Sequence, residues 1–287
     1  MTGAVQAPRA KVLVALACVI CASALACRQP HEPAAPAATT PAPTDKPVGP
    51  TGPTGRIRGV VTLLGTPAAA RSEAVLQNHD VCGQTVGVTR LVVGKSNGVR
   101  HAFVYLDGVK AEGAPVPRAA MQVEQKGCEY GPHTMAIMPG TDLEIVNQDP
   151  ILHNVHARAA TSDGPLTLFN IAQPIPGQRT KLDAPLDKPG VVSLTCEAGH
   201  PWMTAHILVA SHAYVATTND AGEFIIDRVP VGTYPIKMWH EGVQLRRIIP
   251  SLQRYEWEEP YESTQEVVVT ANGETLVNFT IELRKPV

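Results

Sequence analysis

The chain has 287 residues, of which only 5% are aromatic and 17% charged, while Pro and Gly together number 49. This composition excludes a helical bundle or a coiled coil. The formal charge of −2 becomes −4 if Arg9 and Lys11 are removed with an N-terminal signal, and no basic tract is present. Nucleic acid is therefore not an expected partner.

Residues 1–26 have the pattern of an export signal. Arg9 and Lys11 precede an apolar run over 12–26 that ends in small residues and is short for a membrane span. Cys27 follows at once, in a context that resembles a bacterial lipobox. We expect export to the periplasm or the outer surface, with Cys27 lipidated, Cys27 free, or the signal kept as an uncleaved anchor.

Residues 27–55 are predicted to form a disordered tether rich in Pro and Ala. Eight prolines lie between positions 28 and 55, and almost nothing there can be buried. A spacer directly after a membrane tether would let a folded head reach partners beyond the membrane surface. About 230 residues remain, enough for one large β domain or two small ones.

Three of the six cysteines are left in the folded part, because Cys18 and Cys21 leave with the signal and Cys27 lies at the start of the tether. Cys82 and Cys128 both lie in polar stretches with a neighbouring glycine, which are typical of loops. In an oxidising compartment we expect these two to form a disulfide, the alternative being two separate buried thiols. Cys196 is then the remaining thiol.

A thiol, an imidazole and a thioether come close together around Cys196. Residues 191–195 are predicted to be a strand and 197–201 a tight loop, so His200 and Met203 follow the cysteine within one short segment. Sulfur ligands with imidazole suit copper, and Cys with two His and a weak axial Met is the blue-copper set.

The second imidazole has to come from a distant segment. His153 follows a predicted strand over 140–146, and two strands ending at the same pole of a β-sandwich would bring it beside Cys196. Asn154 would hydrogen-bond across to the Cys196 loop and keep the site rigid. His156 is an alternative ligand, although three residues along a strand it faces the opposite side.

This pattern of His-Asn, then Cys, His and Met, resembles the cupredoxin superfamily, and in particular exported bacterial plastocyanin-like proteins. The resemblance covers roughly residues 89–211. It implies a Greek-key β-sandwich and one type 1 copper, with the ligands His153, Cys196, His200 and Met203. Trp202, between two of these ligands, would pack over the metal and shield it from water.

Other metal centres and other chemistries fit less well. The spacing after Cys196 also resembles cytochrome oxidase subunit II, but its two-copper centre needs a cysteine where this chain has Val192. Zinc would gain little from a thioether. A Cys/His nucleophile would need a base and an orienting group, and neither is evident, so no enzymatic activity is expected.

The remaining histidines receive no ligand role. His206 is expected to be structural, His133 has no assigned role, and three are expected on the surface or in loops: His79, His101 and His212.

Residues 213–287 change in character. The pattern from Gly222 to Tyr234 resembles a carboxypeptidase regulatory-like, transthyretin-type β-sandwich, whose opening strand is matched by 57–61. We therefore expect a cupredoxin-like domain with an N-terminal extension over 56–212 and a β module over 213–287, which strand 57–64 could complete. The run 239–241, Trp-His-Glu, is either a small site or a buried Trp with polar neighbours.

The sequence thus predicts an exported all-β protein with one copper that carries single electrons. Its partner would be a redox protein such as a c-type cytochrome or an oxidase. The alternatives are copper storage or delivery, and a structural or ligand-binding surface module with incidental metal.

Overall fold

The computed structural model describes residues 52–66, 71–88, 90–109, 120–249 and 254–285, all within one compact unit over 46–287. The predicted signal, Cys27 and nearly all of the predicted tether lie outside these residues. The first strand begins at Thr54, so it includes the last two residues of the range predicted as tether.

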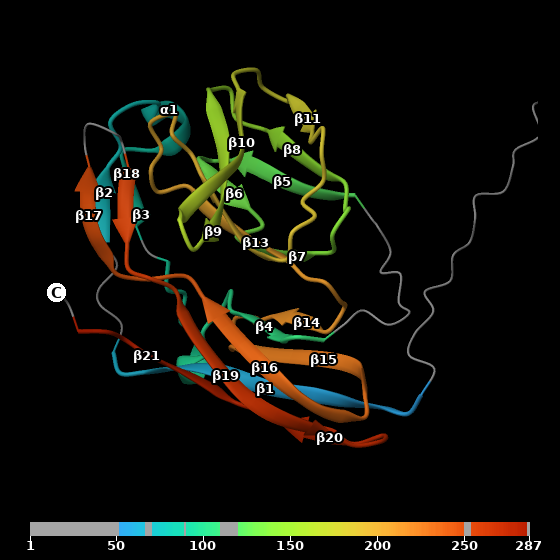
Figure 1. Cartoon of the computed structure of the whole chain (residues 1–287). Coiled ribbons are helices and arrows are strands. Elements are labelled where there is room, and N and C mark those ends of the chain that lie inside the picture. The colour runs from blue at the N-terminus through green and yellow to red at the C-terminus, as the bar shows by residue number, and fades with distance from the viewer. Residues whose placement is uncertain (1–51, 67–70, 89, 110–119, 250–253, 286–287) are drawn as a thin grey trace, which may run out of the picture. The chain divides into compact units, whose positions relative to one another are not determined.

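Two sheets form the sandwich that holds the candidate site. One has the order β10-β9-β12-β13-β7, and its strands span Gly164–Gln173, His153–Thr161, Gly190–Thr195, Thr204–Val209 and Thr134–Ile137. The other has the order β11-β8-β5-β6, and its strands span Arg179–Lys181, Leu143–Asn147, Met121–Lys126 and Glu129–Gly131. Figure 1 shows these strands gathered in one group.

Alternating side chains of these strands fill the core between the two sheets. The core includes Val123, Ile145, Val155, Leu194 and Ile207, all at most 1% exposed. Cys196 and Met203 belong to the same cluster of buried residues, so the candidate site lies at the end of this core.

A second pair of sheets packs around another core. One has the order β15-β1-β20 with β21 also paired to β1, and the other has the order β14-β4-β16-β19. The strands of the first are Glu223–Pro230, Thr54–Leu64, Glu274–Leu276 and Phe279–Glu282. Those of the second are Val215–Thr217, Phe103–Leu106, Gly232–His240 and Tyr261–Val269.

Strands from distant parts of the chain meet in this second sandwich. β1 pairs antiparallel with β15 and parallel with β20 and β21. β4 pairs with β14 and β16. The predicted domain boundary at residue 212 stays a prediction. β1 and β4 precede this residue, and they share sheets with strands that follow it.

The rest of the described chain is short elements. Two hairpins pair β2 (Arg71–Ala74) with β3 (Thr85–Val88) and β17 (Leu245–Ile249) with β18 (Arg254–Trp257). The helices are α1 (His79–Cys82) and the 3-10 turn η1 (Lys95–Asn97). Cys82 therefore ends a single helical turn, where the sequence analysis expected a loop.

The all-β class expected from the sequence is confirmed, and the described strands are consistent with the expected Greek-key sandwich. No helix among the described residues is long and apolar enough to cross a membrane.

β13 is buried along its whole length because both of its faces are covered. Ala205, Ile207 and Val209 face the core of the first sandwich. Leu208, on the other face, packs with Phe103 and Trp239 of β4 and β16. His206 shares that second face, since alternate residues of a strand point in opposite directions.

Candidate metal centre

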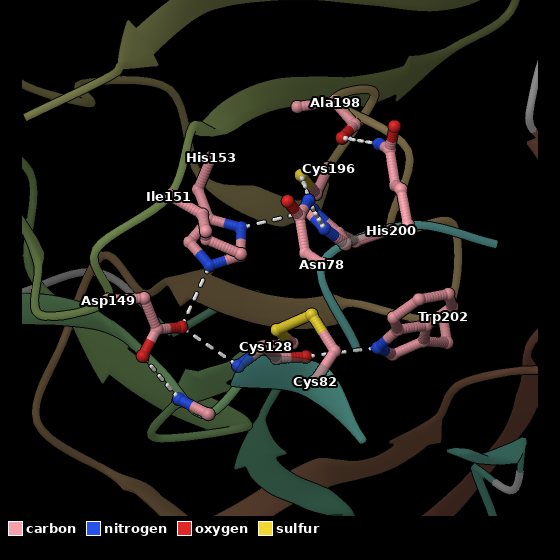
Figure 2. The surroundings of a disulfide bond; sticks show 12 residues. Asn78, Cys82, Cys128, Asp149, Ile151, His153, Cys196, Ala198, His200 and Trp202 are labelled. Atoms are coloured by element: carbon pink, nitrogen blue, oxygen red, sulfur yellow. Dashed lines mark hydrogen bonds and ion pairs between the residues drawn. A yellow bond between two sulfur atoms is a disulfide. The ribbon is translucent and has the colours of Figure 1, made fainter. Parts of the chain in front are cut away.

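Three donor atoms from three elements converge at one end of the first sandwich. His153 is the first residue of β9, Cys196 follows β12, and His200 lies in the loop between β12 and β13. His153 Nδ1 and His200 Nδ1 are 3.2 Å apart, and Cys196 Sγ lies 3.7 Å from His200 Nδ1. Figure 2 shows the three side chains pointing toward one another, and all are at most 2% exposed.

His153 is oriented by the carboxylate of Asp149. His153 Nε2 and Asp149 Oδ2 are 2.8 Å apart, so the ring donates through Nε2 and leaves Nδ1 as an acceptor toward the other donors. The backbone N–H groups of Gly127 and Cys128 also donate to Asp149, at 2.7 and 2.9 Å (Figure 2). The carboxylate is in turn placed by Asn147, whose side-chain oxygen accepts from the Asp149 N–H at 3.0 Å.

His200 has its outer nitrogen against an amide from a distant segment. Asn78 Nδ2 and His200 Nε2 are 3.1 Å apart, across 122 positions of sequence. Rotation of the amide exchanges its donor for its acceptor, so Asn78 can serve either tautomer of the ring. Both imidazoles therefore face the centre with Nδ1 and are held at Nε2.

Backbone hydrogen bonds fix the loop that carries the site. The Met203 N–H donates to the His200 carbonyl at 3.0 Å, and the Cys196 N–H donates to the Met203 carbonyl at 3.3 Å. Asn154 Oδ1 accepts from the Glu197 N–H at 2.6 Å, the contact expected from the sequence. Met203 is 1% exposed and packs in the same core as Cys196.

The chain before α1 closes over the other side of this loop. Gln77 Nε2 donates to the Ala198 carbonyl at 3.0 Å. Gly199 has a φ of +89°, and a Cβ there would lie 1.8 Å from Gln77 Nε2. The backbone conformation therefore favours glycine at this position, and a side chain there would displace the amide of Gln77.

A disulfide joins Cys82 to Cys128 beside His200, whereas Cys196 is a free, buried thiol. Donor atoms of Cys82, Cys128 and His200 all lie within 4.8 Å of one another. The Trp202 indole N–H donates to the Cys128 carbonyl at 3.0 Å, and its ring stands edge-on to that of His200 at 5.5 Å. Trp202 and the disulfide thus cover one side of the site (Figure 2).

Burial governs the protonation of the site. It lowers the pKa of His153, against the opposite effect of Asp149. It also lowers the pKa of His200 to about 4, with repulsion from His153 acting in the same direction. Burial raises the pKa of the Cys196 thiol. For Asp149, burial acts to raise the pKa, but the backbone N–H donors of Cys128 and Gly127 and the contact with His153 outweigh it and lower the value.

His156 lies outside this group of donors. It contacts Thr167 at 2.8 Å and Glu197 at 2.9 Å, on the opposite face of β9 from His153. Among the histidines expected on the surface, His212 is instead 5% exposed, with its Nε2 2.9 Å from the Leu106 carbonyl.

Sequence reasoning missed two residues that hold the imidazoles, Asp149 and Asn78. Asp149 lies in the Asn-Gln-Asp-Pro turn just before His153, and a carboxylate four residues from a candidate ligand was a usable signal. No sequence signal pointed to Asn78, because it contacts His200 only through the way the chain folds across a sequence separation of 122.

The residues present fit a soft transition-metal ion such as copper. Ligand bonds of about 2.0–2.3 Å to a common centre place donor atoms roughly 3–4 Å apart, and the distances of 3.2 and 3.7 Å fall in that range. A thiol and two imidazoles, with a thioether in the same buried cluster, are donors that copper prefers.

No family model matches the chain. No curated protein matches it either. Among solved structures, a purple cupredoxin from Nitrosopumilus maritimus is 23% identical, covering 31% of this chain and 98% of its own, with a TM-score of 0.27. Auracyanin from Roseiflexus castenholzii is 14% identical over 32% of this chain and 96% of its own, also with a TM-score of 0.27.

These structural neighbours are cupredoxins, but the likeness covers about a third of the chain at a low TM-score. The function proposed below is therefore based on the site itself. The resemblance of residues 213–287 to a carboxypeptidase regulatory-like module stays a prediction.

One expectation is corrected by a further neighbour. The sequence analysis expected no enzymatic activity, but a copper-containing nitrite reductase from Thermus scotoductus is also similar, 24% identical over 37% of this chain and 25% of its own, with a TM-score of 0.27. The neighbours thus include an enzyme, and they give no ground for excluding a catalytic role.

Proposed function

We propose that this chain is an exported protein with one type 1 copper that transfers single electrons. The observation that carries the proposal is the buried convergence of His153, Cys196 and His200, with Met203 buried in the same core cluster as Cys196. Copper, when bound, would supply a one-electron couple between Cu(I) and Cu(II). His153, His200 and Cys196 would hold it, with Met203 as the weak axial ligand.

The protein's own contribution is a set of ligands that keep their places. Asp149 and Asn78 hold the two imidazoles from behind, and Asn154 ties the Cys196 loop to β9. A site whose ligands move little between two oxidation states needs little reorganisation for each transfer. Burial of all three donors keeps water from adding to the coordination sphere.

We place the protein in the periplasm or at the outer surface, tethered through its N-terminus. This rests on the signal-like segment and Cys27, together with a disulfide that belongs to an oxidising compartment. The partner we propose is a redox protein such as a c-type cytochrome or an oxidase.

Storage or delivery of copper uses similar ligands and has to be separated by experiment. A carrier should keep one copper per chain through many cycles of reduction and oxidation in the presence of a Cu(I) chelator. Covered ligands favour retention, because a chelator must displace Trp202 or the segment around Asn78 to reach His200. Rapid loss of Cu(I) to the chelator from a chain that stays folded would contradict the carrier and favour delivery.

A further inference from the structure

A second group of metal-ligating side chains lies away from the candidate copper centre. It consists of His133, His206 and Glu241, whose donor atoms all lie within 4.8 Å of one another. His206 Nε2 is 2.9 Å from Glu241 Oε2, and His133 Nε2 contacts Glu241 Oε1. The side chains of His206 and Glu241 are 4% and 3% exposed, and that of His133 is 23% exposed.

Three separate elements bring these residues together. His133 directly precedes β7, His206 is in the middle of β13, and Glu241 directly follows β16. The His206 N–H donates to the His133 carbonyl at 2.8 Å, so the two histidines are fixed to each other through the backbone as well. Strands rather than mobile loops therefore set the spacing of the three side chains.

The surroundings of Glu241 contain polar atoms without partners. In the described part of the chain, four buried side-chain atoms lack a hydrogen bond. One of them, Arg90 Nε, is ion-paired with Glu241, and two belong to residues next to it: His240, which precedes Glu241, and Trp257, whose ring lies against Arg90. Arg90 lies over the Trp257 ring at 4.2 Å and its Nε is 3.0 Å from Glu241 Oε2. His240 is fully buried and directly precedes Glu241. Buried polar groups are rarely left unsatisfied, so a clustering of them points to a species that belongs there.

The group also has a route to solvent. A cavity of about 200 Å³ is lined by Arg90, His101 and His133, and by Met203 and Thr204 at the start of β13. A small ion can therefore reach His133 without unfolding of the chain. The same cavity touches the candidate copper ligand Met203, three residues before His206.

We propose that His133, His206 and Glu241 bind a second metal ion, a divalent first-row transition-metal cation such as Zn²⁺ or Cu²⁺. Two imidazoles and one carboxylate are a common set for these ions. With bonds of about 2.0–2.2 Å, adjacent ligand atoms lie roughly 3 Å apart, and the spacing of 2.9 Å between His206 Nε2 and Glu241 Oε2 agrees. The fourth position is open to a small exchangeable ligand from the cavity.

Arg90 competes with the cation for Glu241. Its guanidinium approaches the same carboxylate oxygen that His206 contacts. Burial lowers the pKa of Arg90, and the ion pair with Glu241 acts against this lowering. A metal ion entering the site would take over the carboxylate and leave Arg90 over the Trp257 ring. Removal of the Arg90 charge should therefore strengthen metal binding.

The test is a titration of the full-length protein with Zn²⁺, followed by calorimetry and native mass spectrometry. We expect His133→Ala to bind one Zn²⁺ fewer than the wild type, or the same ion at least roughly tenfold more weakly. In the described part of the structure, His133 makes no hydrogen bond, ion pair or ring contact with His153, Cys196 or His200, so this difference reports the second site. His79→Ala, which removes an exposed histidine, is the matched control and should bind as the wild type does.

Two further variants test the proposal independently, in case His133→Ala folds poorly. Glu241→Gln keeps the shape of the side chain and should lose the same ion, while Arg90→Gln should bind it roughly tenfold more tightly. Equal Zn²⁺ binding by the wild type, His133→Ala and Glu241→Gln would overturn the proposal, as would weaker binding by Arg90→Gln. In that case the group is a closed set of ion pairs. A last comparison separates the two sites. After loading with copper, Cys196→Ser should lack the colour of the first centre and should still bind Zn²⁺ at the second site.

Discussion

The carboxylate of Asp149 accepts three hydrogen bonds. Two come from backbone N–H groups of the turn that carries Cys128, and one comes from His153. One side chain thereby links a candidate ligand to the disulfide turn. Its lowered pKa keeps it ionised, and an ionised carboxylate accepts but does not donate. His153 Nδ1 is therefore free to serve as a ligand.

We expect Asp149→Asn to weaken copper binding by roughly 10- to 100-fold while the protein stays folded. The amide is neutral and presents one oxygen, so it cannot accept from all three donors. Copper affinity by competition with a chelator measures the effect. Asp142→Asn, an exposed carboxylate paired with Lys181, is the control and should leave the affinity unchanged. An unchanged affinity in Asp149→Asn would show that this carboxylate does not position His153.

The ligands themselves give a second prediction. Cys196→Ser should abolish the strong visible absorption of the copper-loaded protein, because that absorption arises from thiolate-to-copper charge transfer. His153→Ala should damage the coloured site more than His156→Ala, since only His153 Nδ1 faces His200. Absorption spectra of the three variants at equal copper loading decide the matter. Greater damage from His156→Ala would show that the ligand is His156.

Local spacing made much of the candidate site predictable. Cys196, His200 and Met203 share one loop, and His153 with Asn154 follows a strand that ends at the same pole. Asn78 and Glu241 were out of reach of such reasoning, because each meets its partner only through the path of distant segments. The run Trp-His-Glu at 239–241 was noticed, but nothing in the sequence connected it to His133 and His206.

At the level of elements, α1 and its disulfide brace the site. The bond connects the turn after Asn78 to the turn before β6, across a sequence separation of 46. Asn78 and Gln77 both reach the His200 loop from this segment. The disulfide therefore holds in place the chain that covers the site.

Replacing both Cys82 and Cys128 by Ser should lower the free energy of unfolding by about 2–4 kcal/mol, because the unfolded chain regains the entropy of an open loop. Denaturant unfolding of the metal-free protein measures this. The same variant should release copper to a chelator faster, since the segment that carries Asn78 loses its covalent link to the turn at residue 128. A variant that is less stable but holds copper as firmly would show that the cover does not depend on the bond.

Element types were more predictable than their pairing. The sequence predicted strands over 57–64, 140–146 and 191–195, and β1, β8 and β12 lie at these positions. The parallel pairing of β1 with β20 and β21 joins residues more than 200 positions apart. No local pattern encodes such a partner.

Across the whole molecule, several histidines are buried in neutral form. Burial lowers the pKa of His200 to about 4 and that of His101 to about 3, and it also lowers those of His153, His206 and His240. In an unfolded chain these groups return to ordinary values near 6.5. Between about pH 6.5 and 4 the unfolded chain therefore binds more protons than the folded one, and stability falls as the pH falls.

We expect the metal-free protein to lose stability steadily on acidification from about pH 6.5 to 4, which denaturant titrations at several pH values would measure. His200→Gln should show a shallower decline, because one of the contributing groups is gone. A wild-type stability that is flat over this range would contradict the buried, neutral state of these side chains.

The contact between Asn78 and His200 spans 122 positions, and a ribosome makes the chain from its N-terminus. Asn78 is therefore synthesised long before His200, and it has no His200 to contact until that residue emerges. A partly made chain offers no complete set of donors to a passing metal ion. The full set of donors of the proposed copper site exists only once His200 has been made, so capture of the metal would come late in folding.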